Sequence, residues 1–359
     1  MLYAAGMFAP DPFVYLRLKG KCYLVMHDLE IERARKQARH CRVLSFSHYA
    51  RKLRLDGVKN PGFPQVVQAI LRERRLKKIQ VPEHFPIGLA KKLRNLKIKL
   101  KVRAGHFFPE REFKSADEVK KISAALMMAE VGMAEGLQAL KSARAGKGGR
   151  LMYHNAPLTA DKLRAIINVA VIQAGGLASH TIVAAGRQGC DPHERGYGPL
   201  RVNEPIILDI FPRSQKTGYF GDITRTVVKG RASEPLRKLY HTVARGHEMG
   251  CEKLRAGARV AMIHETIQSF FENQGYKTGR INGRMEGFFH GTGHGLGLEI
   301  HEAPHISSAS EEVLRAGHVV TVEPGLYYSK IGSVRLEDVL LITRDGSRNL
   351  TKFEKVLEL

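Results

Sequence analysis

The chain has 359 residues, of which 43% are hydrophobic and 26% are charged. This balance is typical of a globular protein and excludes gross disorder. No apolar run is long enough to cross a bilayer, and we expect neither a signal peptide nor a membrane partner. The four cysteines are widely spaced and form no CxxC pair, which indicates reduced thiols and a cytoplasmic protein.

The net charge of +23 is unevenly distributed along the chain. Residues 1–115 contain 26 Lys and Arg against 9 Asp and Glu, whereas the remainder contains 32 against 26. Such a surface could attract nucleic acid, anionic membranes or acidic peptides. Because no aromatic residues interleave with the charges as in a single-strand platform, we interpret them as a solvated basic face and do not expect a nucleic-acid partner.

The first third of the chain alternates short apolar strands with basic helices. Strands predicted at 21–28 and 41–47 flank a helix at 29–39, a pattern typical of an α/β domain. After a break at 104–115, Ser115 lies three residues before Glu118, which is the spacing of a capping box at a helix N-terminus. We therefore predict one domain at 1–112 and a second at 113–359.

The second domain contains helices followed by strands, twice over. Helices are expected after Ser115, within 157–175 and within 233–275. Strands are expected at 180–186, 205–212, 218–230, 297–303, 317–328 and 332–346. Two similar halves of this kind predict a pseudo-symmetric α+β fold with antiparallel strands.

Carboxylates interrupt several of these apolar strands. They are Asp209 in PIILDIFP, Asp222 in GYFGDITRT, Glu323 after VVTV, and Glu337 and Asp338 in SVRLEDVLL. A buried carboxylate is costly unless it is paired, hydrogen-bonded or bound to a metal ion. Because alternate residues of a strand share a face, Glu337 should point with Arg335 while Asp338 points the opposite way.

A single site containing Asp209, Asp222, Glu323 and Glu337 would hold four negative charges, which two divalent cations would offset. His294, in the glycine-rich segment HGTGHGLGLEIHEAP, could add a nitrogen ligand. An oxygen-rich site of this kind favours Mn²⁺, with Co²⁺, Fe²⁺ or Zn²⁺ as alternatives. Some carboxylates would have to bridge the ions, which leaves positions for the water that hydrolysis needs.

The alternative is that each carboxylate belongs to an ordinary salt bridge. Arg225 and Arg335 are available partners for two of them. Four interrupted strands beside one histidine-rich segment favour the common site over this alternative.

The segments LDIFPRSQKTGYFGDITRT, HGTGHGLGLEIHE, TVEPGLYY and VRLED resemble those of the pita-bread metallopeptidase family. This family includes methionine aminopeptidase, aminopeptidase P, prolidase and creatinase. The resemblance covers the chain from about residue 115 to 359, and the first third is similar to the creatinase-type N-terminal domain. It implies an α+β pita-bread catalytic domain preceded by a smaller α/β domain.

Residue by residue, the resemblance implies a dinuclear metal centre. Asp209 would bind one ion through both oxygens, Asp222 and Glu337 would bridge the ions, and His294 and Glu323 would complete the second. A hydroxide between the ions would attack the scissile carbonyl, and Glu323 would carry the proton to the leaving nitrogen.

The same resemblance implies a set of residues on the substrate side. His290 and His301 would line the substrate and steady the tetrahedral intermediate, and His193 would also contact the substrate. Arg335 lies two residues before Glu337, as in aminopeptidase P and prolidase, and is expected to bind substrate.

The prolyl-peptidase branch fits this sequence best, because VRLED places Arg335 beside Glu337 as in aminopeptidase P and prolidase. The extra N-terminal domain belongs to that branch and to creatinase, whereas a simple methionine aminopeptidase lacks it. We therefore expect a homodimeric enzyme that hydrolyses the bond between some residue and a following proline. Aminopeptidase and dipeptidase activities are not distinguished by these residues. A creatinase-like hydrolase or lyase, and a non-enzymatic binding module that uses the basic N-terminal domain, are the alternatives; the complete ligand set argues against both.

One departure from the family concerns the spacing of two ligands. Asp209 and Asp222 are 13 residues apart, slightly more than the family usually has. The additional residues fall in RSQKTGY, where we expect a hairpin loop that still lets the two ligands converge.

Overall fold

The computed structural model describes residues 1–281 and 283–359, which form two compact units, Met1–Arg111 and Glu112–Leu359. Short 3₁₀ turns lie at Pro109–Glu112, Lys147–Gly149 and Gly186–Cys190. None of the described helices combines the length and apolar character that a bilayer span requires. The assignment of residues 1–112 as a separate creatinase-type domain stays a prediction.

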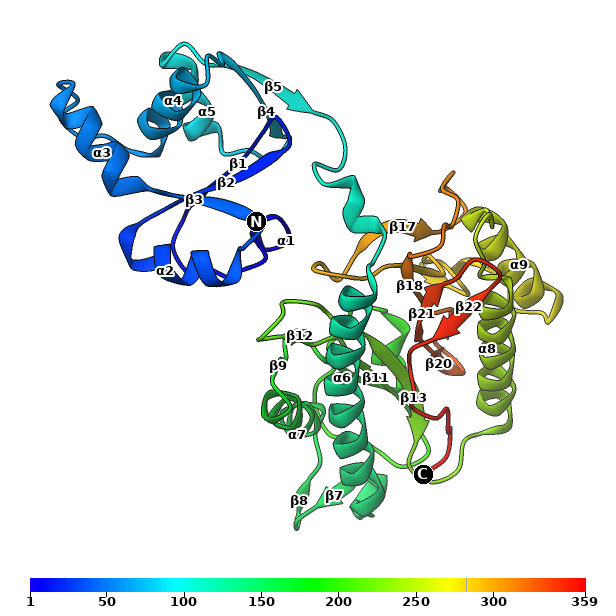
Figure 1. The fold of residues 1–359 in the computed structure, drawn as a ribbon. Coiled ribbons are helices and arrows are strands. Elements are labelled where there is room, and N and C mark those ends of the chain that lie inside the picture. The colour runs from blue at the N-terminus through cyan, green and yellow to red at the C-terminus, as the bar shows by residue number, and fades with distance from the viewer. Residues whose placement is uncertain (282) are drawn as a thin grey trace. The chain divides into compact units, whose positions relative to one another are not determined.

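The first unit contains the expected alternation of strands and helices (Figure 1). Its elements are α1 (Leu2–Ala5), β1 (Val14–Leu18), β2 (Lys21–Met26), α2 (Asp28–Gln37), β3 (Cys41–Ser45), α3 (Phe46–Leu55), α4 (Phe63–Glu73), β4 (Lys78–Pro82), α5 (Ile87–Asn95) and β5 (Lys99–Arg103). β1 is antiparallel to β2, whereas β2–β3 and β4–β5 are parallel pairs connected by helices. The strand expected at 41–47 ends at Ser45, because the Ser45 hydroxyl accepts a hydrogen bond from the His48 N–H and caps α3.

The first half of the second unit begins with a long helix. Its elements are α6 (Ala116–Ser142), β6 (Arg144–Ala145), β7 (Leu151–Tyr153), β8 (Ala156–Pro157), α7 (Ala160–Gln173), β9 (Gly176–Leu177), β10 (Ile182–Ala185), β11 (Pro205–Ile210), β12 (Arg213–Ser214) and β13 (Ile223–Val228). Ser115 and Glu118 form the expected capping box at the start of α6. β10, β11 and β13 form an antiparallel sheet, and α6 lies alongside it around buried residues such as Leu126 and Leu208 (Figure 1).

The second half repeats the plan of two long helices and an antiparallel sheet. Its elements are α8 (Glu234–Lys253), α9 (Val260–Asn273), β14 (Gly279–Ile281), β15 (Arg284–Glu286), β16 (Gly293–Gly295), β17 (Glu302–Ile306), β18 (Val319–Val322), β19 (Gly325–Tyr328), β20 (Gly332–Arg335), β21 (Asp338–Ile342) and β22 (Ser347–Asn349). The larger sheet has the order β17–β16–β18–β21–β22. Buried residues of α8, α9 and these strands, including Val243, Ile267 and Val320, share one core.

Four expected strands of the second unit differ from the structure in detail. The stretch 317–328, expected as one strand, contains β18 and β19, which lie in two different sheets. The strand expected at 297–303 is wrong for most of its length, since β17 begins only at Glu302. The strand expected at 218–230 begins only at Ile223, so Asp222 directly precedes β13. The stretch 332–346, expected as one strand, contains β20 and β21, which lie in two different sheets, and Glu337 lies between them. The apolar pattern predicts burial in each case, but it does not reveal where the ladder hydrogen bonds stop.

Candidate metal centre

The predicted ligands lie at strand ends and come from both halves of the second unit. Asp209 is on β11 and Asp222 directly precedes β13, in the first half. His294 is on β16, Glu323 follows β18, and Glu337 lies between β20 and β21, in the second half. We refer to Asp209, Asp222, Glu323 and Glu337 as the acid cluster.

The structure brings these side chains together. Asp222, His294 and Glu337 each offer one ligand atom, and these three atoms all lie within 4.8 Å of one another. The His294 Nε2 atom is 3.4 Å from Glu323 Oε1 and 3.7 Å from Asp222 Oδ2. Asp209 is close enough for its charge to raise the pKa of Asp222, Glu323 and Glu337.

The tautomer of His294 follows from its hydrogen bond to the main chain. Nδ1 lies 3.1 Å from the Gly295 carbonyl oxygen, which can only accept, so Nδ1 carries the proton. Burial and the neighbouring His301 lower the pKa of His294 to about 3, and the ring is therefore neutral. The Nε2 atom of His294 thus carries no proton and turns its lone pair toward oxygens of Asp222 and Glu323, an arrangement that fits a cation at their meeting point.

Two carboxylate oxygens of the acid cluster are buried without a hydrogen-bond partner. The Thr224 hydroxyl donates to Glu337 Oε2 at 2.8 Å, and Glu337 Oε1 has no partner. Arg335 Nη2 donates to Asp209 Oδ2 at 2.6 Å, and Asp209 Oδ1 has none. Since buried polar atoms are normally satisfied, these two free oxygens fit ligation of the hard or borderline divalent cations that oxygen-rich donor sets prefer.

The electrostatics of the cluster lead to the same conclusion. Burial, followed by repulsion from Glu337, Asp209 and Glu323, raises the pKa of Asp222 well above its usual value. Burial and the same neighbours raise the pKa of Glu337 well above its usual value, and burial with Asp209 raises the pKa of Glu323 to about 8. Arg335 offsets only part of this negative charge, so the ionised cluster requires further cations.

Glycines beside two ligands allow the chain to approach its neighbours closely. A Cβ atom on Gly221, next to Asp222, would lie 2.3 Å from the Leu126 amide nitrogen in α6. Gly293 and Gly295 flank His294, and a Cβ on either would lie 2.0 to 2.2 Å from a backbone oxygen of an adjacent strand. Side chains at these positions would push the strands apart and move the ligands.

The longer spacing between Asp209 and Asp222 is accommodated by a tight loop. The Ser214 N–H donates to the Tyr219 carbonyl, and the Gly218 N–H donates to the Ser214 carbonyl, each at 2.8 Å. The loop therefore closes on itself, and the two aspartates lie in the same cluster despite the additional residues.

His290 is engaged on both ring nitrogens. Nδ1 lies 2.7 Å from the Gly291 carbonyl oxygen and therefore carries the proton, so Nε2 accepts a hydrogen bond from the Tyr327 hydroxyl at 2.8 Å. Arg335 Nη1 donates to the same hydroxyl at 3.1 Å. Burial and Arg335 lower the pKa of His290 to about 3. A chain of hydrogen bonds thus connects His290 to Asp209 through Tyr327 and Arg335.

The remaining substrate-side residues differ in exposure. His301 is exposed and its ring lies 4.4 Å from the His294 ring, centroid to centroid. His193 is also exposed, and its charge lowers the pKa of both His290 and His301. Arg335 is buried and also contacts the Pro192 carbonyl at 3.4 Å. The substrate-binding roles expected for these residues stay predictions.

The salt-bridge alternative holds for two of the carboxylates. Arg335 pairs with Asp209, and Arg225 pairs with Asp338 at 2.9 Å. Within the described part of the chain, Lys and Arg form no ion pair with Asp222, Glu323 or Glu337. The carboxylates that form no ion pair with Lys or Arg are therefore the ones that lie beside His294.

The sequence did not single out Tyr327 or Thr224 as site residues. Tyr327 lies in TVEPGLYY four residues after Glu323, and it is fully buried between His290 and Arg335. Thr224 shares a strand face with Asp222, which was a usable signal, but its hydrogen bond to Glu337 spans 113 residues of sequence.

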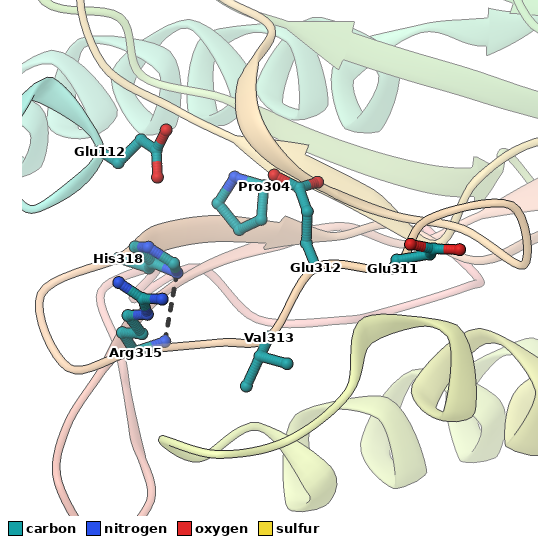
Figure 2. A pocket seen from close by; sticks show the side chains of 7 residues that line it. All are labelled: Glu112, Pro304, Glu311, Glu312, Val313, Arg315 and His318. Carbon is teal, nitrogen blue, oxygen red and sulfur yellow. Dashed lines mark hydrogen bonds between the residues drawn. The ribbon is translucent and has the colours of Figure 1, made fainter. Parts of the chain in front are cut away.

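A separate hollow in the second unit involves none of these residues. This cavity has a volume of about 290 Å³. Figure 2 shows the side chains that line it, which are Glu112, Pro304, Glu311, Glu312, Val313, Arg315 and His318. His318 Nδ1 accepts a hydrogen bond from the Arg315 N–H at 3.3 Å, and burial lowers the pKa of His318 to about 4. The cavity is thus lined in part by a neutral histidine and shares no residue with the candidate metal centre.

The sequence pattern of metallopeptidase family M24 matches residues 120–344. The Xaa-Pro dipeptidase of Pyrococcus horikoshii is 33% identical over 181 residues, which cover 50% of this chain and 49% of that protein. The Xaa-Pro dipeptidase of Pyrococcus furiosus is 35% identical over 180 residues, with 50% and 49% covered. The match therefore spans about half the length of these curated relatives.

Solved structures resemble the whole chain. The Xaa-Pro dipeptidase from Bacillus anthracis has a TM-score of 0.82 at 24% identity, covering 100% of this chain and 92% of that one. The X-Pro aminopeptidase from Thermotoga maritima has a TM-score of 0.83 at 22% identity, with 100% and 93% covered. These similarities confirm the α+β pita-bread fold that the sequence predicts.

Proposed function

Because the chain belongs to metallopeptidase family M24, we propose that it is a metal-dependent peptidase that cleaves the bond between a residue and a following proline. One observation carries the metal dependence: the His294 lone pair and the carboxylates of Asp222, Glu323 and Glu337 lie close together, and among the residues that the structure describes no Lys or Arg forms an ion pair with these three carboxylates. The Xaa-Pro specificity is supported by the names of the relatives in both comparisons.

In this proposal two divalent ions, with Mn²⁺ as the preferred metal, are held by Asp209, Asp222, His294, Glu323 and Glu337. When bound, the ions would polarise the scissile carbonyl and supply a hydroxide nucleophile between them. Co²⁺, Fe²⁺ or Zn²⁺ would suit the same donors.

Glu323 is proposed as the residue that transfers the proton to the leaving nitrogen. Its side chain is 21% exposed, compared with 13% for Asp209, 9% for His294 and 5% for Asp222. Glu337 as a residue is 2% exposed, so Glu323 is the most accessible of the proposed ligands. A proton shuttle must reach both the nucleophile and the substrate, and this exposure supports that role for Glu323.

The substrate side is proposed to consist of His193, His290, His301 and Arg335. His193 and His301 are exposed, so they can meet a peptide directly. His290 is held by Tyr327, and Arg335 is held by Asp209 and Tyr327. Both can therefore present a fixed geometry to the substrate, which is what stabilisation of a tetrahedral intermediate requires.

We also propose that the protein is a cytoplasmic homodimer. Its substrate is proposed to be a peptide with proline after the scissile bond. The four free cysteines support a reducing compartment. The basic first unit is proposed to be a creatinase-type domain with a solvated surface.

The test combines metal stoichiometry with product analysis. Chelator-stripped protein reloaded with Mn²⁺ should approach two ions per chain, and one or none would contradict the dinuclear centre. The reloaded protein should then release the residue before proline from Xaa-Pro dipeptides or from longer Xaa-Pro-Xaa peptides, identified by mass. Cleavage of dipeptides alone favours a prolidase, cleavage of longer chains favours an aminopeptidase P, and cleavage of neither overturns the specificity.

A further inference from the structure

We propose that Thr224 and Arg225 are positioning residues that together fix Glu337, a proposed metal ligand, in the orientation that binding requires. This inference rests on the proposed function, because Glu337 is proposed there as a metal ligand. It concerns residues that contact neither substrate nor reacting atoms.

Arg225 is the centre of this arrangement, and its guanidinium is completely satisfied. Nη1 donates to the carbonyl oxygens of Glu337 at 2.6 Å and Thr224 at 2.9 Å. Nη2 donates to Asp338 Oδ1 at 2.9 Å and to the Phe353 carbonyl at 2.6 Å. Nε donates to the Glu354 carbonyl at 2.9 Å, so all five N–H groups have acceptors.

Thr224 holds the other parts of the same ligand. Its hydroxyl donates to Glu337 Oε2 at 2.8 Å, and its carbonyl accepts from the Glu337 N–H at 3.1 Å. The main-chain nitrogen, the main-chain oxygen and one carboxylate oxygen of Glu337 are thus all fixed by two consecutive residues of β13. Only Glu337 Oε1 is left without a partner.

The position of Arg225 shows why its charge does not compete with the ions. Thr224 and Arg225 point to opposite faces of β13, and Arg225 forms its ion pair with Asp338, the residue after Glu337. Both members of this pair are 1% exposed in their side chains. The positive charge of Arg225 is therefore compensated by Asp338 on the face of β13 opposite to the Thr224 side chain. The hydrogen bond from Arg225 to the Glu337 carbonyl still restrains the proposed ligand.

A lysine at position 225 would keep the charge but could not make five fixed hydrogen bonds in one plane. Removing a group that orients a ligand typically weakens metal binding about 10-fold to 100-fold. Isothermal titration of chelator-stripped Arg225→Lys with Mn²⁺ should show a Kd raised by about this factor. The matched control is Arg245→Lys on α8, whose arginine is half-exposed and pairs with surface glutamates; its Kd should equal that of the wild type.

A second pair of variants covers the case in which Arg225→Lys does not fold. Thr224→Val removes the hydroxyl that donates to Glu337, whereas Thr224→Ser retains it. The inference requires the valine variant to bind Mn²⁺ more weakly than the wild type and the serine variant to bind close to the wild-type level. A valine variant that folds and binds as tightly as the serine variant would contradict it.

The outcomes also separate this inference from the proposed function. If wild-type protein binds no Mn²⁺, the proposed metal centre fails. If the wild type binds two ions but a folded Arg225→Lys protein binds them with unchanged Kd, Arg225 is merely structural and the inference fails, even if the melting temperature of the variant falls.

Discussion

Glu337 and Asp338 are neighbours in sequence, are both buried, and lie in opposite electrostatic environments. Glu337 belongs to the acid cluster, where the other groups are mostly carboxylates. Asp338 lies among Arg225, Lys355 and His247, and we refer to these four residues as the Asp338 cluster. Because successive side chains of an extended chain point to opposite faces, the two carboxylates lie in different surroundings.

The difference is evident in the two pKa values. Burial raises the pKa of Glu337 well above its usual value, and Glu323 and Asp209 raise it further. Burial would also raise the pKa of Asp338, but His247, Arg225 and Lys355 together lower it to about 2. Burial alone therefore does not distinguish a structural carboxylate from a ligand; the presence or absence of cationic side chains does.

The largest expected effect belongs to the proposed proton shuttle in the acid cluster. Glu323→Gln should fold yet turn over Xaa-Pro peptides about 10²-fold to 10⁴-fold more slowly, because general acid–base catalysis contributes on this scale. Steady-state rates of Mn²⁺-loaded protein provide the measurement. The control is Glu248→Gln, which changes a mostly exposed glutamate on α8; a near-normal rate for Glu323→Gln would remove it from the mechanism.

The Asp338 cluster should respond in stability. Asp338→Asn leaves the buried Arg225 without its carboxylate, and breaking a buried pair in this way costs about 3–5 kcal/mol. Urea unfolding of the variant and the wild type, both loaded with Mn²⁺, measures this loss. A change below about 1 kcal/mol, the range of exposed pairs, would mean that the ion pair does not stabilise the fold.

The two clusters should give opposite pH dependence in metal-free protein. The pKa of Glu323 is raised to about 8, so the folded state keeps a proton that the unfolded state releases above about pH 4.5, and the contribution of Glu323 to the free energy of unfolding falls as pH rises through this range. The pKa of Asp338 is lowered to about 2, so its contribution is lost as pH falls below about 4.

The buried histidines His290, His294 and His318, whose pKa values are lowered to about 3 to 4, give the opposite slope below about pH 6.5. Urea titrations between pH 7 and 8 therefore isolate the Glu323 contribution, with a slope on the order of 1 kcal/mol per pH unit, and titrations below pH 4 test Asp338. Mn²⁺ should remove the decline at the upper end, because bound cations favour the ionised carboxylates. A metal-free protein whose stability rises between pH 7 and 8 would contradict the raised pKa of Glu323.

The smallest effect sharpens the comparison between the two neighbours. In metal-free protein, Glu337→Gln removes a buried carboxyl whose ionised form has no cationic partner, so stability should be unchanged or increase by on the order of 1 kcal/mol. The same substitution should weaken Mn²⁺ binding. Unfolding and calorimetric titration of one preparation measure both, and a loss as large as that of Asp338→Asn would erase the distinction between the clusters.

Local sequence was sufficient for much of this description. Apolar periodicity predicts most helices and strands, the capping box at Ser115 predicts the start of α6, and carboxylates within apolar strands predict a shared site. The interrupted strands and the segment around His294 also carry the family resemblance that the comparisons support. These signals depend on residues close together in sequence, whose spacing alone fixes which side chains share a face.

Only the tertiary structure determined which cation meets which acid. Arg225 and Asp338 are 113 residues apart, and Arg335 and Asp209 are 126 apart, so either arginine was an equal candidate from the sequence. The same holds for Thr224 on Glu337 and Tyr327 on His290. Strand register and sheet order place these groups within a few ångströms, and electrostatic energies inside a protein depend on those distances and on burial, which no local pattern encodes.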